Sequence, residues 1–237
     1  MLVAAALAAT GVPALARAGI RVATGRSYVG TVRRSAQNHI DGGRSDPISV
    51  NVSTNGRTVT VIAVYNNCPV EGISYPELAF PTARIVDGRF RTTFSKVEKV
   101  QTLYADISVT GRFLSRGRVR GRISSVTNVS HRSFGLPGPV CGTSNAWGAT
   151  AQPRGFHVCA PHPLGIFGGA QDITDDHVPC GVVERALARG RFKPPPPPLA
   201  PDATFSSPGW ACQARRTPIR SWRCTRTDQT FEFLVAS

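Results

Sequence analysis

The chain has 237 residues, of which 41% are apolar and 18% are charged, so it can form one large domain or two small ones with real hydrophobic cores. Its 23 glycines and 19 prolines favour short strands and turns and argue against long helices. The formal net charge is +14, and the 28 basic residues include only three lysines. Arginine suits phosphate and carboxylate groups, but codon usage in a GC-rich genome gives the same excess, and net charge excludes no fold.

The N-terminal residues 1–18 have the features of a signal peptide. An apolar run over 2–12 precedes small residues with an A-x-A pattern within 14–18. The run is too short to span a bilayer, which takes about 20 residues, and no later segment is a candidate transmembrane helix. Although the usual basic opening is missing, we expect an exported, extracellular protein with a short linker over 19–26.

Six cysteines follow this segment, namely Cys68, Cys141, Cys159, Cys180, Cys212 and Cys224. In an exported chain, an even number of cysteines favours disulfide bonds over free thiols. Six cysteines allow about fifteen pairings, and the sequence alone does not choose among them.

Residues 27–152 show the alternation of antiparallel strands. Residues 47–53 alternate isoleucine and valine with polar residues, whereas 57–68 is apolar on both faces and is expected to be a central strand. Glycine-containing turn signals separate the segments. About eight short strands with such turns predict an antiparallel β-sandwich or barrel.

Residues 153–172 are rich in proline and glycine and predict a linker. Residues 173–237 predict a small α+β module with one helix on a three-stranded sheet. We expect Asp175 or Asp176 to be the N-cap of the helix and Gly190 to end it. The apolar stripe of this helix consists of Cys180, Val183, Ala186 and Leu187. A unit of this size is marginally stable without disulfides.

Two interpretations fit the segment from Cys159 to Cys180. The order Cys-x2-His followed by His-x2-Cys would supply the four ligands of a closed tetrahedral zinc site, namely Cys159, His162, His177 and Cys180. Export favours oxidation instead, because zinc requires thiolates that an oxidising compartment does not preserve. A disulfide is the favoured interpretation, a zinc site or metal-dependent enzyme is the alternative, and no cofactor is expected.

A second candidate site is an arginine ladder. Every second residue of one segment is basic, namely Arg116, Arg118, Arg120 and Arg122. On a strand these side chains project from one face, with Val119 and Ile123 on the other. The ladder is either a solvated outer face or a binding surface for an anionic cell-envelope polymer. No aromatic side chains interleave with it, so specific nucleic-acid binding is not expected.

The sequence contains no recognisable catalytic motif. It lacks a G-x-S-x-G elbow, and the acidic segment around His177 lacks the glycine and final glutamate of a calcium loop. We therefore expect a non-enzymatic binding or structural protein of the cell exterior.

Short motifs also occur in a fixed order along the chain. In the first part they are Gly25 to Thr31, Asp87 to Phe90, Gly111 to Phe113, Gly121 to Ile123 and Cys141 to Ala149. In the second part they are Cys180, Gly209 to Cys212, Cys224 and Phe231 to Phe233.

These motifs resemble those of a group of secreted two-domain proteins of high-GC Gram-positive bacteria. The resemblance covers most of 25–237, and the opening motif departs from the usual G-x-Y by one residue. It implies a disulfide between Cys68 and Cys141, an extracellular location and the two-domain fold. It implies no activity.

Overall fold

The computed structural model describes residues 22–33, 46–63, 77–98, 103–129, 140–163, 169–193, 204–215 and 221–236. The expected signal peptide, the first part of the expected linker over 19–26, and Cys68 lie outside these ranges. Within them, no helix is both long and apolar enough to cross a membrane.

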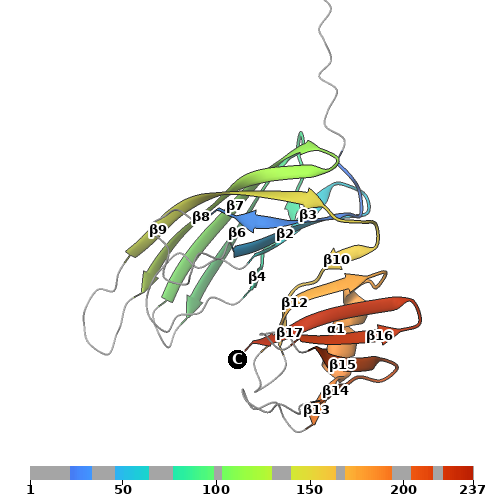
Figure 1. The fold of residues 1–237 in the computed structure, drawn as a ribbon. Helices are drawn as coiled ribbons and strands as arrows, with labels where there is room; N and C mark the ends of the chain where they lie inside the picture. The colour runs from blue at the N-terminus through green and yellow to red at the C-terminus, as the bar shows by residue number, and fades with distance from the viewer. Residues whose placement is uncertain are drawn as a thin grey trace, which may run out of the picture.

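The first unit is a single nine-stranded antiparallel sheet. Its strand order is β4-β3-β2-β1-β9-β8-β7-β6, and β5 also pairs with β3. The bounds are β1 (Ser27–Val32), β2 (Asp46–Val52), β3 (Thr58–Ala63), β4 (Leu78–Ala79), β5 (Ala83–Arg84), β6 (Arg89–Glu98), β7 (Leu103–Ser115), β8 (Arg118–Val129) and β9 (Val140–Ala151). The sheet curls on itself as a half-barrel, which confirms the predicted mainly β, antiparallel domain (Figure 1).

Alternation along the strands builds the core inside this curl. Tyr28, Ile107, Phe113 and Ile123 are almost fully buried, whereas the outward neighbours of Phe113, Arg112 and Leu114, are exposed. Glycines allow large rings to cross neighbouring strands: a Cβ on Gly121 would lie 1.8 Å from the backbone oxygen of Thr110 and 2.7 Å from the Trp147 ring. The missing side chain lets the Trp147 ring pack directly over Gly121, its partner across β8 and β9.

The second unit combines a six-stranded sheet, a helix and a two-stranded sheet. The larger sheet has the order β10-β12-β17-β16-β15, and β11 also pairs with β12. The bounds are β10 (Phe156–Val158), β11 (His162–Pro163), β12 (Gly169–Asp176), α1 (Cys180–Arg189), β13 (Arg191–Lys193), β14 (Thr204–Ser206), β15 (Ala211–Arg215), β16 (Ser221–Arg226) and β17 (Gln229–Ala236). The apolar face of α1, formed by Val183, Ala186 and Leu187, is buried as predicted.

Three details of this unit differ from expectation. The expected linker over 153–172 contains β10, β11 and the start of β12, because its short extended pieces pair with a strand that the proline and glycine content concealed. The expected three-stranded sheet has six strands for the same reason. Pro179, not Asp175 or Asp176, is the N-cap, and no side chain caps the helix.

The two units touch where the chain leaves the first sheet. Arg26 donates from Nη1 to the carbonyl of Gln152 at 2.9 Å, and Asn51 donates from Nδ2 to the carbonyl of Val158 at 2.6 Å. The amide oxygen of Asn51 accepts a 2.5 Å hydrogen bond from the Ser27 hydroxyl. Strand β10 therefore lies against the outer side of β1 and β2.

The Gly121→Ala substitution tests the close packing of Trp147 over this glycine. The added methyl group must displace backbone, so we expect unfolding stability to fall by about 1–3 kcal/mol, as in overpacked cores. Gly142→Ala is the matched control in the same sheet, because its Cβ would meet no atom closer than 3.9 Å. Equal thermal midpoints for the two variants would contradict the packing described here.

Candidate functional site

Three arginines lie side by side on the outer face of the curled sheet. In the strand register Arg89 is opposite Arg112, and Arg112 is opposite Arg120. All three are exposed. In the next outward row along the strands, Arg91 and Arg122 lie on either side of Thr110. The basic surface therefore spans β6, β7 and β8. We call Arg89, Arg112 and Arg120 the arginine row.

The row continues into an open depression at one end of the sheet. The depression has a volume of about 1850 Å³ and is formed mainly by residues before β1, the β2–β3 turn, the β5–β6 turn and the β7–β8 turn. Its basic lining residues are Arg26, Arg84, Arg89, Arg91, Arg112, Arg116 and Arg154. The only acidic residue described in its lining is Asp87. Both the outward row and the rim of the sheet thus present guanidinium groups to the same region.

Two local structures position these arginines. The turn between Val86 and Arg89 places Asp87 and Gly88 at positive φ, the geometry of a tight hairpin turn, and so brings Arg89 to the edge of the depression. The buried Tyr28 hydroxyl donates to the carbonyl of Arg116 at 2.9 Å, which fixes the β7–β8 turn against the core. Burial raises the pKa of Tyr28, so this hydroxyl stays protonated as the donor.

The four arginines of the predicted ladder lie partly on strand β8 and partly in the β7–β8 turn. Arg118, Arg120 and Arg122 are exposed on β8, opposite the buried Val119 and Ile123, as the alternation indicates. Arg116 lies in the turn before β8 and lines the depression. Arg89, Arg91 and Arg112 were not predicted as part of this surface, because their neighbours across the sheet follow from register and not from spacing along the chain.

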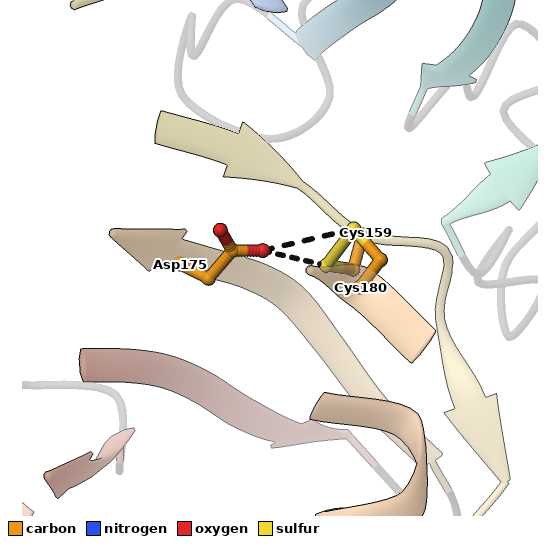
Figure 2. Close-up of side chains that lie close together, drawn as sticks. All are labelled: Cys159, Asp175 and Cys180. Atoms are coloured by element: carbon orange, nitrogen blue, oxygen red, sulfur yellow. Dashed lines mark hydrogen bonds between the residues drawn. A yellow bond between two sulfur atoms is a disulfide. The ribbon is translucent and has the colours of Figure 1, made fainter. Parts of the chain in front are cut away.

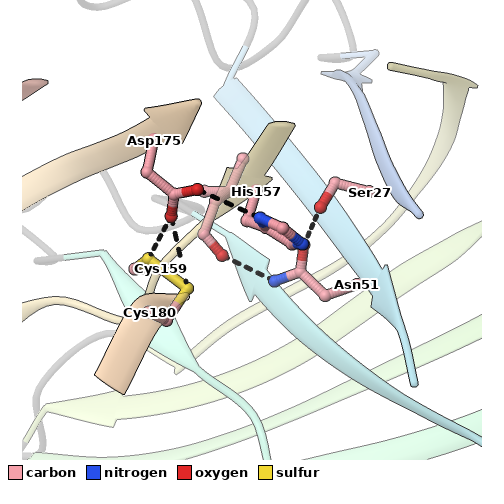
Figure 3. The surroundings of a disulfide bond; sticks show 7 residues. Ser27, Asn51, His157, Cys159, Asp175 and Cys180 are labelled. Carbon is pink, nitrogen blue, oxygen red and sulfur yellow. Dashed lines mark hydrogen bonds and ion pairs between the residues drawn. A yellow bond between two sulfur atoms is a disulfide. The ribbon is translucent and has the colours of Figure 1, made fainter. Parts of the chain in front are cut away.

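A second cluster of polar groups lies in the core of the second unit. Asp175 follows Ile173 by two residues on β12, so its side chain occupies an inward position that alternation normally reserves for an apolar residue. The carboxyl is fully buried, and one oxygen lies 3.0 Å from Nδ1 of His157 on β10. The other oxygen lies 2.9 Å from Sγ of Cys159 and 3.6 Å from Sγ of Cys180 (Figures 2 and 3).

Burial raises the pKa of Asp175 from 3.8 to about 6. The contact with His157 and the backbone N–H of Val178 lower the pKa, and the charge of Asp176 raises it, but desolvation is the largest effect. The carboxyl is therefore partly protonated near neutral pH.

The cysteines of this cluster are oxidised. Cys159 is bonded to Cys180, and Cys212 is bonded to Cys224 across β15 and β16, which confirms that the chain contains disulfide bonds. The resemblance-based pair of Cys68 and Cys141 stays a prediction, because Cys68 lies outside the described residues.

The four residues of the zinc interpretation are not gathered into one site. The potential ligands that converge here are Cys159, Asp175 and Cys180, and neither His162 nor His177 belongs to this group. His177 instead contacts the exposed Asp176 at 2.8 Å. In a disulfide neither sulfur is a thiolate, so Cys159 and Cys180 offer no ligand to zinc while they are bonded to each other.

From the sequence, Asp175 or Asp176 was expected to be the N-cap of the helix. The available signal was its spacing from Ile173, which places an aspartate on the buried face of a strand. That signal depends on recognising β12 (Gly169–Asp176) as a strand, whereas its first half was predicted as linker and its last two residues as the start of the helix.

Comparison of the chain with protein-family models, with curated proteins and with solved structures gives no match. The features of the site itself therefore carry the functional argument.

The raised pKa of Asp175 predicts a pH-dependent stability for the second unit. Between about pH 4 and 6 the folded state binds more protons than the unfolded state, so stability falls as the pH rises through this window and stays lower above it. A shift from 3.8 to about 6 corresponds to about 3 kcal/mol. We expect Asp175→Asn to remove this dependence in urea unfolding of the oxidised protein from pH 4 to 8.

Asp176→Asn is the matched control, because the Asp176 carboxyl is exposed. This variant should keep the pH dependence of the stability. Parallel stability curves for the wild type and Asp175→Asn would show that Asp175 does not titrate in this range.

Proposed function

We propose that this protein is an extracellular, non-enzymatic binding protein whose ligand is an anionic polymer held at the arginine row and the adjoining depression. Two disulfides support an oxidising compartment, where such proteins are found. The expected ligand carries phosphate or carboxylate groups at regular intervals, as polymers of the cell envelope do.

The arginine row is the observation that carries this proposal. Like charges directly opposite each other on neighbouring strands destabilise a sheet by roughly 0.2–1 kcal/mol per pair. Arg112 faces an arginine on both sides, and none of the ion pairs among the described residues includes a member of the row. A bound anion would remove this repulsion, so the arrangement is costly without a ligand and favourable with one.

The residues around the arginine row favour a polymer that is recognised by its charged groups. Guanidinium groups form paired hydrogen bonds to phosphate and carboxylate oxygens. Thr110 lies between Arg91 and Arg122, and the next outward row along the sheet is small and hydroxylic, namely Thr93, Ser108, Ser124 and Ser144. Beside the arginine row, the outward residues whose side chains the structure describes include no aromatic ring for stacking a base, which favours a charged backbone over a nucleic-acid sequence.

Arg112→Thr separates the two effects of the row. Removing the central charge relieves repulsion on both sides, so we expect unfolding stability at low salt to rise by a few tenths to about 1 kcal/mol. The same change should weaken binding of inorganic polyphosphate by roughly fivefold or more, as for the loss of about 1 kcal/mol at a charged contact. Urea unfolding and titration calorimetry measure the two quantities.

Arg191→Thr is the matched control, since Arg191 is exposed on a strand of the second unit and is not part of the depression. It removes the same charge and should change polyphosphate affinity only slightly. If both variants weaken binding equally, the basic charge of the whole chain accounts for the binding, and the proposed site is wrong.

A further inference from the structure

The two sulfurs of the Cys159–Cys180 disulfide differ in their access to solvent. We call the Cys180 end the open side and the Cys159 end the closed side. Cys159 is 1% exposed, whereas Cys180 is partly exposed and begins α1. The first turn of α1 contains no acidic residue. The N-terminus of a helix stabilises a thiolate, so Cys180 is suited both to meet an external thiol and to leave as an anion.

The closed side is the side on which Asp175 lies. Its Oδ2 atom is 2.9 Å from the buried sulfur of Cys159. A disulfide sulfur carries no hydrogen, so any hydrogen bond between these two atoms must use the proton of the carboxyl group. In the reduced state the Cys159 thiol would be the donor and the carboxylate the acceptor. The same contact therefore accommodates both redox states by moving one proton.

We propose that the Cys159–Cys180 bond is a redox-exchangeable disulfide that reacts with a dithiol, with Cys180 as the attacked sulfur and Asp175 as the catalytic acid for Cys159. This reactivity goes beyond the proposed polymer binding and does not depend on the arginine row.

The exchange balances in two steps. One thiolate of the dithiol attacks Sγ of Cys180, the protein disulfide breaks, and its electron pair goes to Sγ of Cys159, which takes the proton of Asp175. The second thiol of the dithiol loses its proton to solvent and attacks the dithiol sulfur that is bonded to Sγ of Cys180. The mixed disulfide breaks, and Cys180 leaves as a thiolate. The dithiol is oxidised to a disulfide by two electrons, and the protein gains two cysteines in reduced form.

The groups around Asp175 fit the role of an acid. His157 on β10 faces the oxygen that does not contact sulfur, and Asp176 is its neighbour on β12. Strand β17 faces Asp175 with Phe231, which is fully buried and carries no charge. Burial raises the pKa of Asp175 to about 6, so the acid is available below neutral pH and is lost above it.

Reduction of the full-length oxidised protein by dithiothreitol tests the proposal. The two disulfides are followed separately from pH 5 to 8 by acid quenching, alkylation and peptide mass mapping, and each rate is divided by the thiolate concentration. For Cys159–Cys180 we expect this normalised rate to fall at least about tenfold across the range as Asp175 ionises. Cys212–Cys224 is the internal control and should show no such fall.

Variants identify the acid and distinguish direct attack from unfolding. Asp175→Asn should lower the normalised rate at pH 5 by at least about tenfold and remove its pH dependence. Asp176→Asn should keep the fall in rate with pH and move it only slightly to lower pH, because the Asp176 charge makes a minor contribution to the raised pKa of Asp175. Direct attack makes the rate proportional to dithiothreitol concentration, and a monothiol such as glutathione should form its mixed disulfide on Cys180. A rate that is independent of dithiothreitol, an adduct on Cys159, or an unaltered Asp175→Asn rate at pH 5 would overturn the proposal.

Discussion

The antiparallel pairing of β1 with β9 is the constraint on which the rest of the structure depends. Strand β1 is paired on one side with β2, its neighbour along the chain, and on the other side with β9, the last strand of the first sheet. This pairing joins the meander β1–β3 to the meander β6–β9 and brings the two ends of the first unit together. Long-range closure of this kind is entropically costly, and the buried side chains of both meanders inside one curled sheet offset that cost.

Both candidate sites follow from this closure. Because β9 ends beside the start of β1, Arg26 and Arg154 come to the same rim as the β5–β6 and β7–β8 turns, and the depression receives arginines from distant parts of the sequence. Because the chain leaves β9 next to β1 and β2, β10 is held against Asn51 and carries His157 to the buried carboxyl of Asp175 (Figure 3). The position at which the chain leaves β9 therefore determines where the basic depression forms and where His157 meets Asp175 in the second unit.

The sequence predicted those features that depend on local pattern. Alternation and turn signals identified the antiparallel domain, the apolar stripe of α1 and the outward direction of Arg118, Arg120 and Arg122. Features set by long-range pairing were not predictable in this way. The opposition of Arg112 to Arg89 and Arg120 depends on register, and β10 and β11 are strands only because β12 pairs with them. Asp175 was misassigned for the same reason, since a buried carboxylate on a strand and an exposed cap before a helix look alike in sequence.

The most direct test of this account is a cross-link between β1 and β9. Val29 and Thr150 are directly opposite each other in the register, so the double substitution Val29→Cys and Thr150→Cys should give one new disulfide between these positions in peptide mass maps. The pair Val29→Cys and Ala146→Cys is out of register by four residues and should remain unlinked. Linkage of the second pair, or free thiols in the first, would contradict the pairing that places both sites.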